Sequence, residues 1–276
     1  MGFMDRIDPQ FGGRCIIPHT SEDKAGAVTL TANASADTKG SYTEILAAAS
    51  NVFTIGMIVI ETGQTNVSGT DTGQLMDVAI GAASSEQVII ANIPTGWSAL
   101  QDKPLCIPLI IPEGERVSAR IQASTGSDTV DVLMSFYEVG AYRSYQHCQT
   151  IGADTTNSCG TTVETTSWVE LDASIDDHVE ALVPIFDFGS GGSFGGDSNE
   201  FDIGVGAASS EVQVYPPSSE SFGLLMETGS QENISLVTYP ASHVLPTQIN
   251  IPAGTRVAMR RPNGGRDSGC VLLGLS

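Results

Sequence analysis

The sequence predicts an all-β protein built from two tandem β-sandwich domains, jelly-roll-like in type, that arose by internal duplication. The first observation behind this prediction is a block, residues 77–86, that returns almost letter for letter as residues 202–211. The second is composition: only 16% of the residues are charged and 30 are glycine, a balance typical of many short strands joined by tight turns. The third is that no segment has a convincing amphipathic helical pattern.

The length of the chain also fits two domains, since 276 residues can be shared between units of roughly 100 to 200 residues. We expect four segments: an extended N-terminal arm (1–38), a first sandwich repeat (39–141), a polar linker (142–162) and a second sandwich repeat (163–276). The arm has no periodic pattern but carries Phe3 and Phe11. A free tail gains nothing from exposing aromatic side chains, so the arm is predicted to lie on a neighbouring subunit.

The first repeat opens with two strand-like segments that the second repeat also contains. Residues 41–45 correspond to residues 167–171, and the run 53–60 corresponds to residues 179–186 at the same spacing. Both segments have the length of strands and lie between turn residues, and the first copy of the run is rich in β-branched side chains. Each repeat is therefore expected to begin with the same pair of strands.

The later part of each repeat is predicted to be a hairpin followed by a closing strand. Residues 111–120 and 251–260 share the pattern Ile-Pro-x-Gly-x-Arg-Val-x-x-Arg, in which proline presets φ and glycine relieves a tight turn before a strand. The closing strands are residues 130–136 and 270–275. Immunoglobulin-like and jelly-roll topologies both fit, and the absence of a Cys…Trp…Cys pattern at immunoglobulin spacing favours the jelly roll.

Four arginines at matched positions are the candidate site residues. They are Arg116 and Arg120 in the first repeat and Arg256 and Arg260 in the second. Alternate residues of a strand share one face, so each pair points the same way while the intervening valine enters the core. One interpretation is cross-strand pairing with acids such as Glu44 and Glu170. The other is an assembly interface, in which these arginines, with Phe3 and Phe11 of the arm, meet an adjacent subunit.

The charge of the chain argues against nucleic acid as a partner. The sequence has 12 basic and 32 acidic residues, a formal net charge of −20, with no lysine or arginine between Arg143 and Arg256. Phosphates are bound through lysine and arginine, so such a surface would repel them. The acidity is expected to support solubility, with divalent-cation binding as the alternative. The sequence shows neither a signal-peptide pattern nor an apolar run of membrane-spanning length, so we expect cytoplasmic synthesis without membrane association.

No segment predicts a catalytic residue, a cofactor or a metal site. Residues 191–195 match G-x-S-x-G, but a nucleophile elbow needs a strand before the serine and a helix after it, and here the surroundings are rich in glycine. The histidines lack the spacing of metal ligands. The acidic turn at residues 172–178 is interpreted as solvated, with calcium binding as the alternative.

The five cysteines are an odd number without CxxC spacing, so neither a zinc site nor a complete disulfide framework is indicated. Cys106 and Cys270 lie in apolar runs and are expected to be buried thiols. Cys148 and Cys159 flank a polar loop, where they either form a disulfide or remain separate thiols.

Two motifs carry a resemblance to a known class of proteins. The block Gly-Ala-Ala-Ser-Ser-Glu, followed by Ile-Pro-x-Gly-x-Arg-Val-x-x-Arg, occurs in both repeats. This combination resembles structural proteins of tailed bacteriophages, in which tandem sandwiches decorate a capsid or build part of a tail. The resemblance covers residues 40–276. It implies an all-β component of the virion that associates with itself and with other virion proteins, and it brings no functional residues with it.

We therefore expect a non-enzymatic structural protein of a phage particle, one that decorates the capsid or has another surface or assembly role. It is expected to form a homo-oligomer, with a trimer as one option. One alternative is a carbohydrate- or receptor-binding module of a tail or fibre that recognises a host-surface glycan. Another is a double jelly-roll major capsid protein, which is disfavoured because a shell lining a genome needs basic side chains and the arm offers only Arg6, Arg14 and Lys24.

Overall fold

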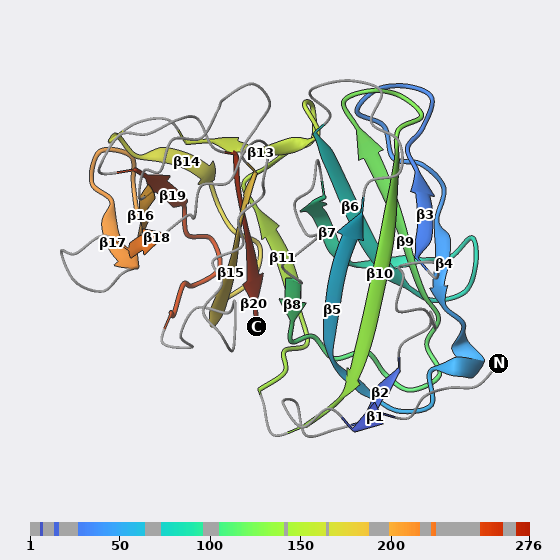
Figure 1. The fold of residues 1–276 in the computed structure, drawn as a ribbon. Coiled ribbons are helices and arrows are strands. Elements are labelled where there is room, and N and C mark those ends of the chain that lie inside the picture. Colours follow the sequence, from blue (N-terminus) through green and yellow to red (C-terminus); the bar gives the residue numbers. More distant parts are fainter. Residues whose placement is uncertain are drawn as a thin grey trace.

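The structure is a computed structural model that describes residues 6–7, 14–16, 27–63, 73–95, 105–140, 143–163, 166–187, 199–215, 222–224, 249–261 and 269–276. Within these residues the chain is all-β, as predicted, and its only helical element is the 3₁₀ turn η1 (Ala48–Ser50). The described segments accordingly include no helix that could cross a membrane. Figure 1 shows two bodies side by side, which we call the first half (up to residue 140) and the second half (from residue 143).

The first half contains two antiparallel sheets that enclose one apolar core. The β10 sheet has the order β1-β2-β10-β5-β8, with β3 also pairing with β10; its strands are β1 Arg6–Ile7, β2 Arg14–Ile16, β3 Val28–Thr31, β5 Ile55–Gly63, β8 Leu105–Ile107 and β10 Thr129–Glu138. The β9 sheet has the order β4-β9-β6-β7; its strands are β4 Thr43–Leu46, β6 Gln74–Ile80, β7 Gln87–Pro94 and β9 Val117–Ala123.

The second half also contains two antiparallel layers. The β20 sheet has the order β11-β20-β13-β12, with β15 also pairing with β20; its strands are β11 Cys148–Ile151, β12 Ala153–Asp154, β13 Cys159–Thr162, β15 Ala181–Asp187 and β20 Gly269–Leu275. The β19 sheet has the order β14-β19-β16-β17, with β18 also pairing with β16; its strands are β14 Val169–Asp172, β16 Asn199–Val205, β17 Val212–Tyr215, β18 Phe222–Leu224 and β19 Val257–Arg260.

The arm and the linker expected from the sequence both contain strands of these sheets. Within the predicted arm, β2 and β3 pair with β10 of the same chain, and Leu30 is fully buried. Within the predicted linker, β11 and β13 pair with β20. These strands are three or four residues long, which is too short for a period-two pattern to stand out. Phe3 and Phe11 lie outside the described residues.

The alternation of buried and exposed residues defines the core of the first half. In β10, the even-numbered residues Val130, Val132, Met134 and Phe136 are buried, while the odd-numbered residues remain partly exposed. Side chains of the β9 sheet, such as Val78, complete the same cluster. One face of β10 is thus apolar, as expected where a strand covers a core on one side.

The β20 sheet is buried on both faces, and this joins the two halves. Cys270 and Leu272 belong to the core of the second half, whereas Val271, Leu273 and Leu275 belong to the same cluster as the core of the first half. This double burial explains why the closing strand is apolar throughout its length. The contacts between the halves include those of β11 and β15 with β7, and Figure 1 shows β11 close to β7.

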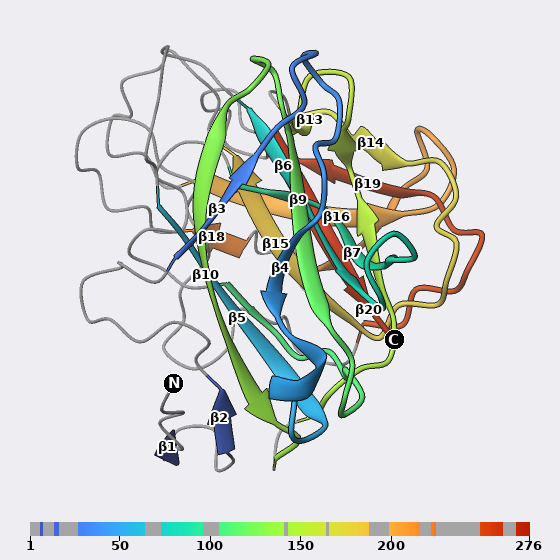
Figure 2. The ribbon, with the colours of Figure 1, turned by 90° about the vertical axis from the view of Figure 1, so that its right-hand side faces the viewer.

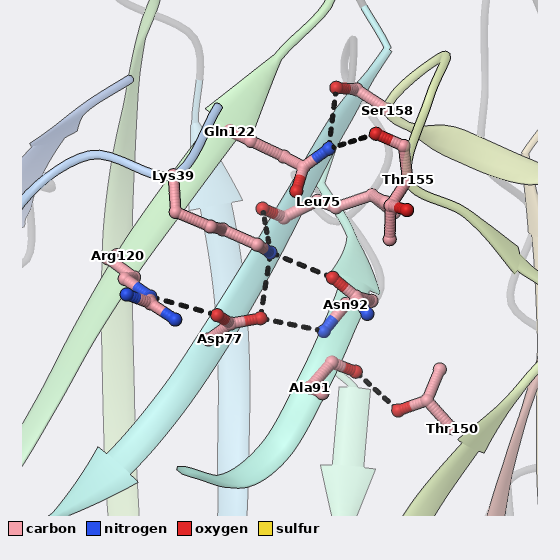
Figure 3. A network of polar contacts seen from close by, with 10 residues as sticks. All are labelled: Lys39, Leu75, Asp77, Ala91, Asn92, Arg120, Gln122, Thr150, Thr155 and Ser158. Carbon is pink, nitrogen blue, oxygen red and sulfur yellow. Dashed lines mark hydrogen bonds and ion pairs between the residues drawn. The ribbon is translucent and has the colours of Figure 1, made fainter. Parts of the chain in front are cut away.

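Polar contacts also tie the halves together. The Gln122 side chain on β9 donates to the carbonyl oxygen of Thr155 at 2.8 Å and to the Ser158 hydroxyl at 3.0 Å. Ser158 in turn donates to Asp37 Oδ1 at 2.6 Å, and the Thr150 hydroxyl donates to the Ala91 carbonyl oxygen. The turn between β12 and β13 is therefore docked on the outer face of the β9 sheet (Figure 3).

Candidate functional site

Arg116 binds the corner that follows β6. Its Nε donates to Glu44 Oε2 at 2.8 Å, and its Nη1 donates to Glu86 Oε1 at 3.2 Å and to the carbonyl oxygen of Gly81 at 3.4 Å. Glu44 lies on the neighbouring strand β4, whereas Glu86 is the last residue of the repeated block 77–86. One guanidinium therefore connects β4 to both ends of the turn that follows β6.

Arg256 makes the same set of contacts in the second half. Its Nε donates to Glu170 Oε2 at 2.6 Å, and its Nη1 donates to Glu211 Oε1 at 2.9 Å and to the carbonyl oxygen of Gly206 at 3.2 Å. The hydrogen bond to Glu170 raises the pKa of Arg256 above its ordinary value. The predicted cross-strand pairing of the matched arginines with Glu44 and Glu170 is thus confirmed.

Backbone geometry explains the other constant letters of the repeated block. Gly81 and Gly206 have φ of 107° and 111°, where a side chain would strain the backbone, and Ser84 and Ser209 follow with φ of 70° and 67°. The corner that these residues form carries its glutamate back towards the arginine. The block is preserved because one turn and one ion cluster occur twice.

Arg120 and Arg260 each bind a buried carboxylate and stack on an aromatic ring. Arg120 Nε lies 2.9 Å from Asp77 Oδ2, and its guanidinium carbon is 4.5 Å from the centre of the Tyr42 ring. Arg260 Nε lies 2.8 Å from Asp202 Oδ2, with Trp168 in the place of the tyrosine, also at 4.5 Å. Both carboxylates are nearly inaccessible to water. The first pair links β6 to β9, and the second links β16 to β19, each on the outer face of its own sheet.

Trp168 depends on the absence of a side chain at residue 204. A Cβ added to Gly204 would lie 2.7 Å from Cη2 of the indole. We expect Gly204→Ala to lower the free energy of unfolding by about 1–3 kcal/mol, because the ring must move. Urea denaturation measures this cost, and Trp168→Tyr, which restores the smaller ring of the first half, should reduce it. An equal cost in both backgrounds would show that the indole is not the obstacle.

The two halves differ in what else surrounds the carboxylate. In the first half, Lys39 Nζ donates to Asp77 Oδ1 at 2.7 Å, to Asn92 Oδ1 at 2.8 Å and to the Leu75 carbonyl oxygen at 3.2 Å. The backbone N–H of Asn92 donates to the same Asp77 oxygen at 2.9 Å. We call Lys39, Asp77, Asn92 and Arg120 the Lys39 network, and Figure 3 shows its members converging on β6.

The surroundings of Lys39 lower the pKa of its amine. Burial lowers the pKa of Lys39, the attraction of Asp77 opposes that effect, and the nearby Arg120 adds to the lowering. Two cationic side chains thus share one carboxylate. In the second half, among the residues described, Asp202 is instead approached by Gln213 Nε2 at 3.3 Å.

The remaining sequence candidates do not form a reactive site among the described residues. The acidic turn is fixed by Gln149, whose Oε1 accepts from the backbone N–H groups of Asp176 and Asp177. No group of three or more potential metal ligands is found in the part of the chain that the structure describes. The glycine-rich stretch at residues 191–195 lies outside that part.

The cysteines are all described, and none of them forms a disulfide, so the pairing considered for Cys148 and Cys159 does not occur in this structure. Cys270 is fully buried, as predicted, whereas Cys106 is only partly buried. Burial raises the pKa of Cys106 to about 11 and that of Cys148 to about 12, so both are protonated thiols at neutral pH.

Comparison with known proteins adds no relative. No protein-family model matches this chain, and no curated protein matches its sequence. The structure engages the four matched arginines within the chain, and their role in contacts between subunits remains a prediction.

Proposed function

We propose that this protein is a non-enzymatic structural component of a tailed-phage particle that decorates the capsid or fills another surface or assembly role. The observation that carries the proposal is the strand order. In the first half, successive strands from β3 to β10 fall into the groups β3-β10-β5-β8 and β4-β9-β6-β7. This distribution supports an eight-stranded jelly roll, a fold common in viral capsid proteins.

The second half supports the same reading and an origin by duplication. Its strands follow the orders β13-β20-β15 and β14-β19-β16-β17, which parallel those of the first half. The corner contacts of Arg116 recur around Arg256, and the stacked pair at Arg120 recurs at Arg260. Two similar units in one chain present related surfaces, which suits packing in a symmetric particle.

The shared core suits a structural role. The β20 sheet is buried between the two halves, so the units form one block rather than two domains on a flexible tether. Glu44 and Glu170 remain about half exposed while bound to arginine, and they are the acids of the matched clusters that a neighbouring subunit can reach. The double jelly-roll major capsid protein stays an alternative, and the net charge of −20 opposes it.

Self-association and particle location test the proposal together. Size-exclusion chromatography with light scattering is expected to give a homo-oligomer for the full chain at micromolar concentration. A variant without residues 1–13 keeps β2 and β3. If its oligomer contains fewer subunits than that of the full chain, the deleted residues contribute to assembly. Mass spectrometry of purified particles should find the protein in stoichiometric amounts. A monomer that is absent from particles would refute the structural role.

A glycan-binding role for a tail or fibre is the second candidate, and Trp168 is the observation that favours it. The indole is partly exposed on the outer face of the β19 sheet, beside Arg260. Aromatic rings flanked by charged donors can stack against sugars and hydrogen-bond to them. A glycan array should then show binding that Trp168→Ala abolishes, and the absence of binding by the unmodified protein excludes this role for the glycans tested.

A further inference from the structure

We propose that Lys39 and Asn92 join in an intramolecular isopeptide bond, which the chain forms by itself with release of ammonia. Lys39 Nζ lies 2.8 Å from Asn92 Oδ1 and 2.7 Å from Asp77 Oδ1. Figure 3 shows the three groups converging from β6, from β7 and from the segment between β3 and β4. The inference concerns a covalent modification and does not depend on the function proposed above.

The surroundings of Lys39 favour the neutral amine that the attack requires. A lysine becomes a nucleophile when it loses a proton, and desolvation or a second cation promotes that loss. Lys39 is subject to both effects, through its burial and through Arg120. Asp77 can accept the proton, because its Oδ1 is the nearest of the three acceptors around Nζ, while Arg120 holds its Oδ2 at 2.9 Å.

Asn92 is held in the position of an electrophile. Its backbone has φ of 53°, and the pairing of β6 with β7 shifts register next to it, between Met76 and Val78. Such a bulge re-aims side chains. Since a C=O bond measures about 1.23 Å, the carbonyl carbon of Asn92 lies within about 4 Å of Nζ. Reacting atoms in near-attack geometry are roughly 3–3.5 Å apart, so a small movement brings the two groups together.

The reaction balances without any other reagent. Lys39 passes a proton to Asp77, and the neutral Nζ attacks Cγ of Asn92 and forms the new carbon–nitrogen bond. The bond from Cγ to Nδ2 then breaks, and Nδ2 leaves as ammonia after taking up a proton relayed from Nζ through Asp77. One amine and one carboxamide become one amide and one ammonia. The Lys39 side chain keeps 18% of its surface exposed, which leaves a route for ammonia to reach water.

The second half provides an internal comparison. It keeps the carboxylate and the arginine, Asp202 and Arg260, but the side chain that approaches the carboxylate there is Gln213, not a lysine. An amide cannot replace the amine as nucleophile. The bond is therefore proposed for the first half alone, where it would fasten the segment between β3 and β4 to β7.

Mass spectrometry tests the proposal directly. The intact, denatured protein should weigh less than its sequence by one ammonia. Trypsin should fail to cleave after Lys39, and digestion with a second protease should release one branched peptide that contains Lys39 and Asn92. Peptide mapping is essential, because succinimide formation at an asparagine such as Asn263, which precedes glycine, also releases ammonia.

Variants separate the proposed bond from other losses of ammonia. Lys39→Arg and Asn92→Ala should each have the full mass of their sequences, whereas Gln213→Ala should retain the loss. Protein of full mass that is cleaved normally after Lys39, following incubation at mildly alkaline pH, overturns the proposal. A loss that persists in Lys39→Arg or maps to another asparagine overturns it as well. The decisive measurement uses the chain without any substitution, so it does not depend on the folding of a variant.

Discussion

Leu273→Ala is expected to lower the free energy of unfolding by about 2–5 kcal/mol, one of the two largest losses that we predict for a single substitution. Leu273 is fully buried, and although it lies on β20 of the second half, it belongs to the core cluster of the first half. Removing its side chain leaves a cavity between the halves that neither sheet can close without moving the other. Urea denaturation followed by circular dichroism measures the change.

Leu133→Ala is the matched control. Leu133 lies on β10, which is the closing strand of the first half, and it points to the partly exposed face of that strand. Its truncation should cost less than about 1 kcal/mol, because most of the transfer and cavity terms are absent. Equal losses for the two leucines would mean that the contact between the halves contributes little. A second unfolding transition in Leu273→Ala alone would show that the halves had become uncoupled.

The longer strands were predictable because their patterns are strong and occur twice. The Ile-Pro-x-Gly turn and the strand after it were predictable in each half, and each closing strand was predictable as a mostly apolar run of strand length. The predicted hairpin was wrong, because Ile111 and Ile251 bridge to Ile55 and Val179, whereas β9 and β19 pair with strands of the opposite sheet. The arm and linker were misjudged because β2, β3, β11 and β13 are brief and rely on pairing with β10 or β20 for their stability. The shared core was hidden for a different reason. A strand buried on both faces shows no alternation, so its second partner leaves no signature.

The contacts of the candidate site were also predictable only in part. The pairing of Arg116 with Glu44 followed from strand periodicity and from its recurrence at Arg256 and Glu170. Lys39 carried no such signal, because it lies in a connection and has no lysine counterpart in the described part of the second half. Its contact with Asn92 depends on a bulge, and a shift in register cannot be read from a single strand.

Asp77→Ala is expected to cost about 3–5 kcal/mol, the range found when one partner of a buried ion pair is removed. The substitution leaves Lys39 buried without its carboxylate and deprives Arg120 of its principal partner. It also removes the group that is proposed to transfer protons during cross-linking, so the unmodified mass should return. Intact mass reports the loss of the bond. Chemical denaturation reports the cost of removing the carboxylate when Asp77→Ala is introduced into Asn92→Ala, a reference that cannot form the bond.

Asp202→Ala is the control for this prediction, because it removes the equivalent carboxylate where there is an arginine but no lysine. The Arg260 side chain is 33% exposed and can turn towards water, so we expect a smaller cost of about 1–3 kcal/mol. Adding Lys39→Met to Asp77→Ala should bring the cost down to a similar value, since the buried amine is then gone. If the double substitution lowers the free energy of unfolding as much as Asp77→Ala alone, the buried Lys39 amine is not the cause. The packing of Asp77 itself must then account for the loss.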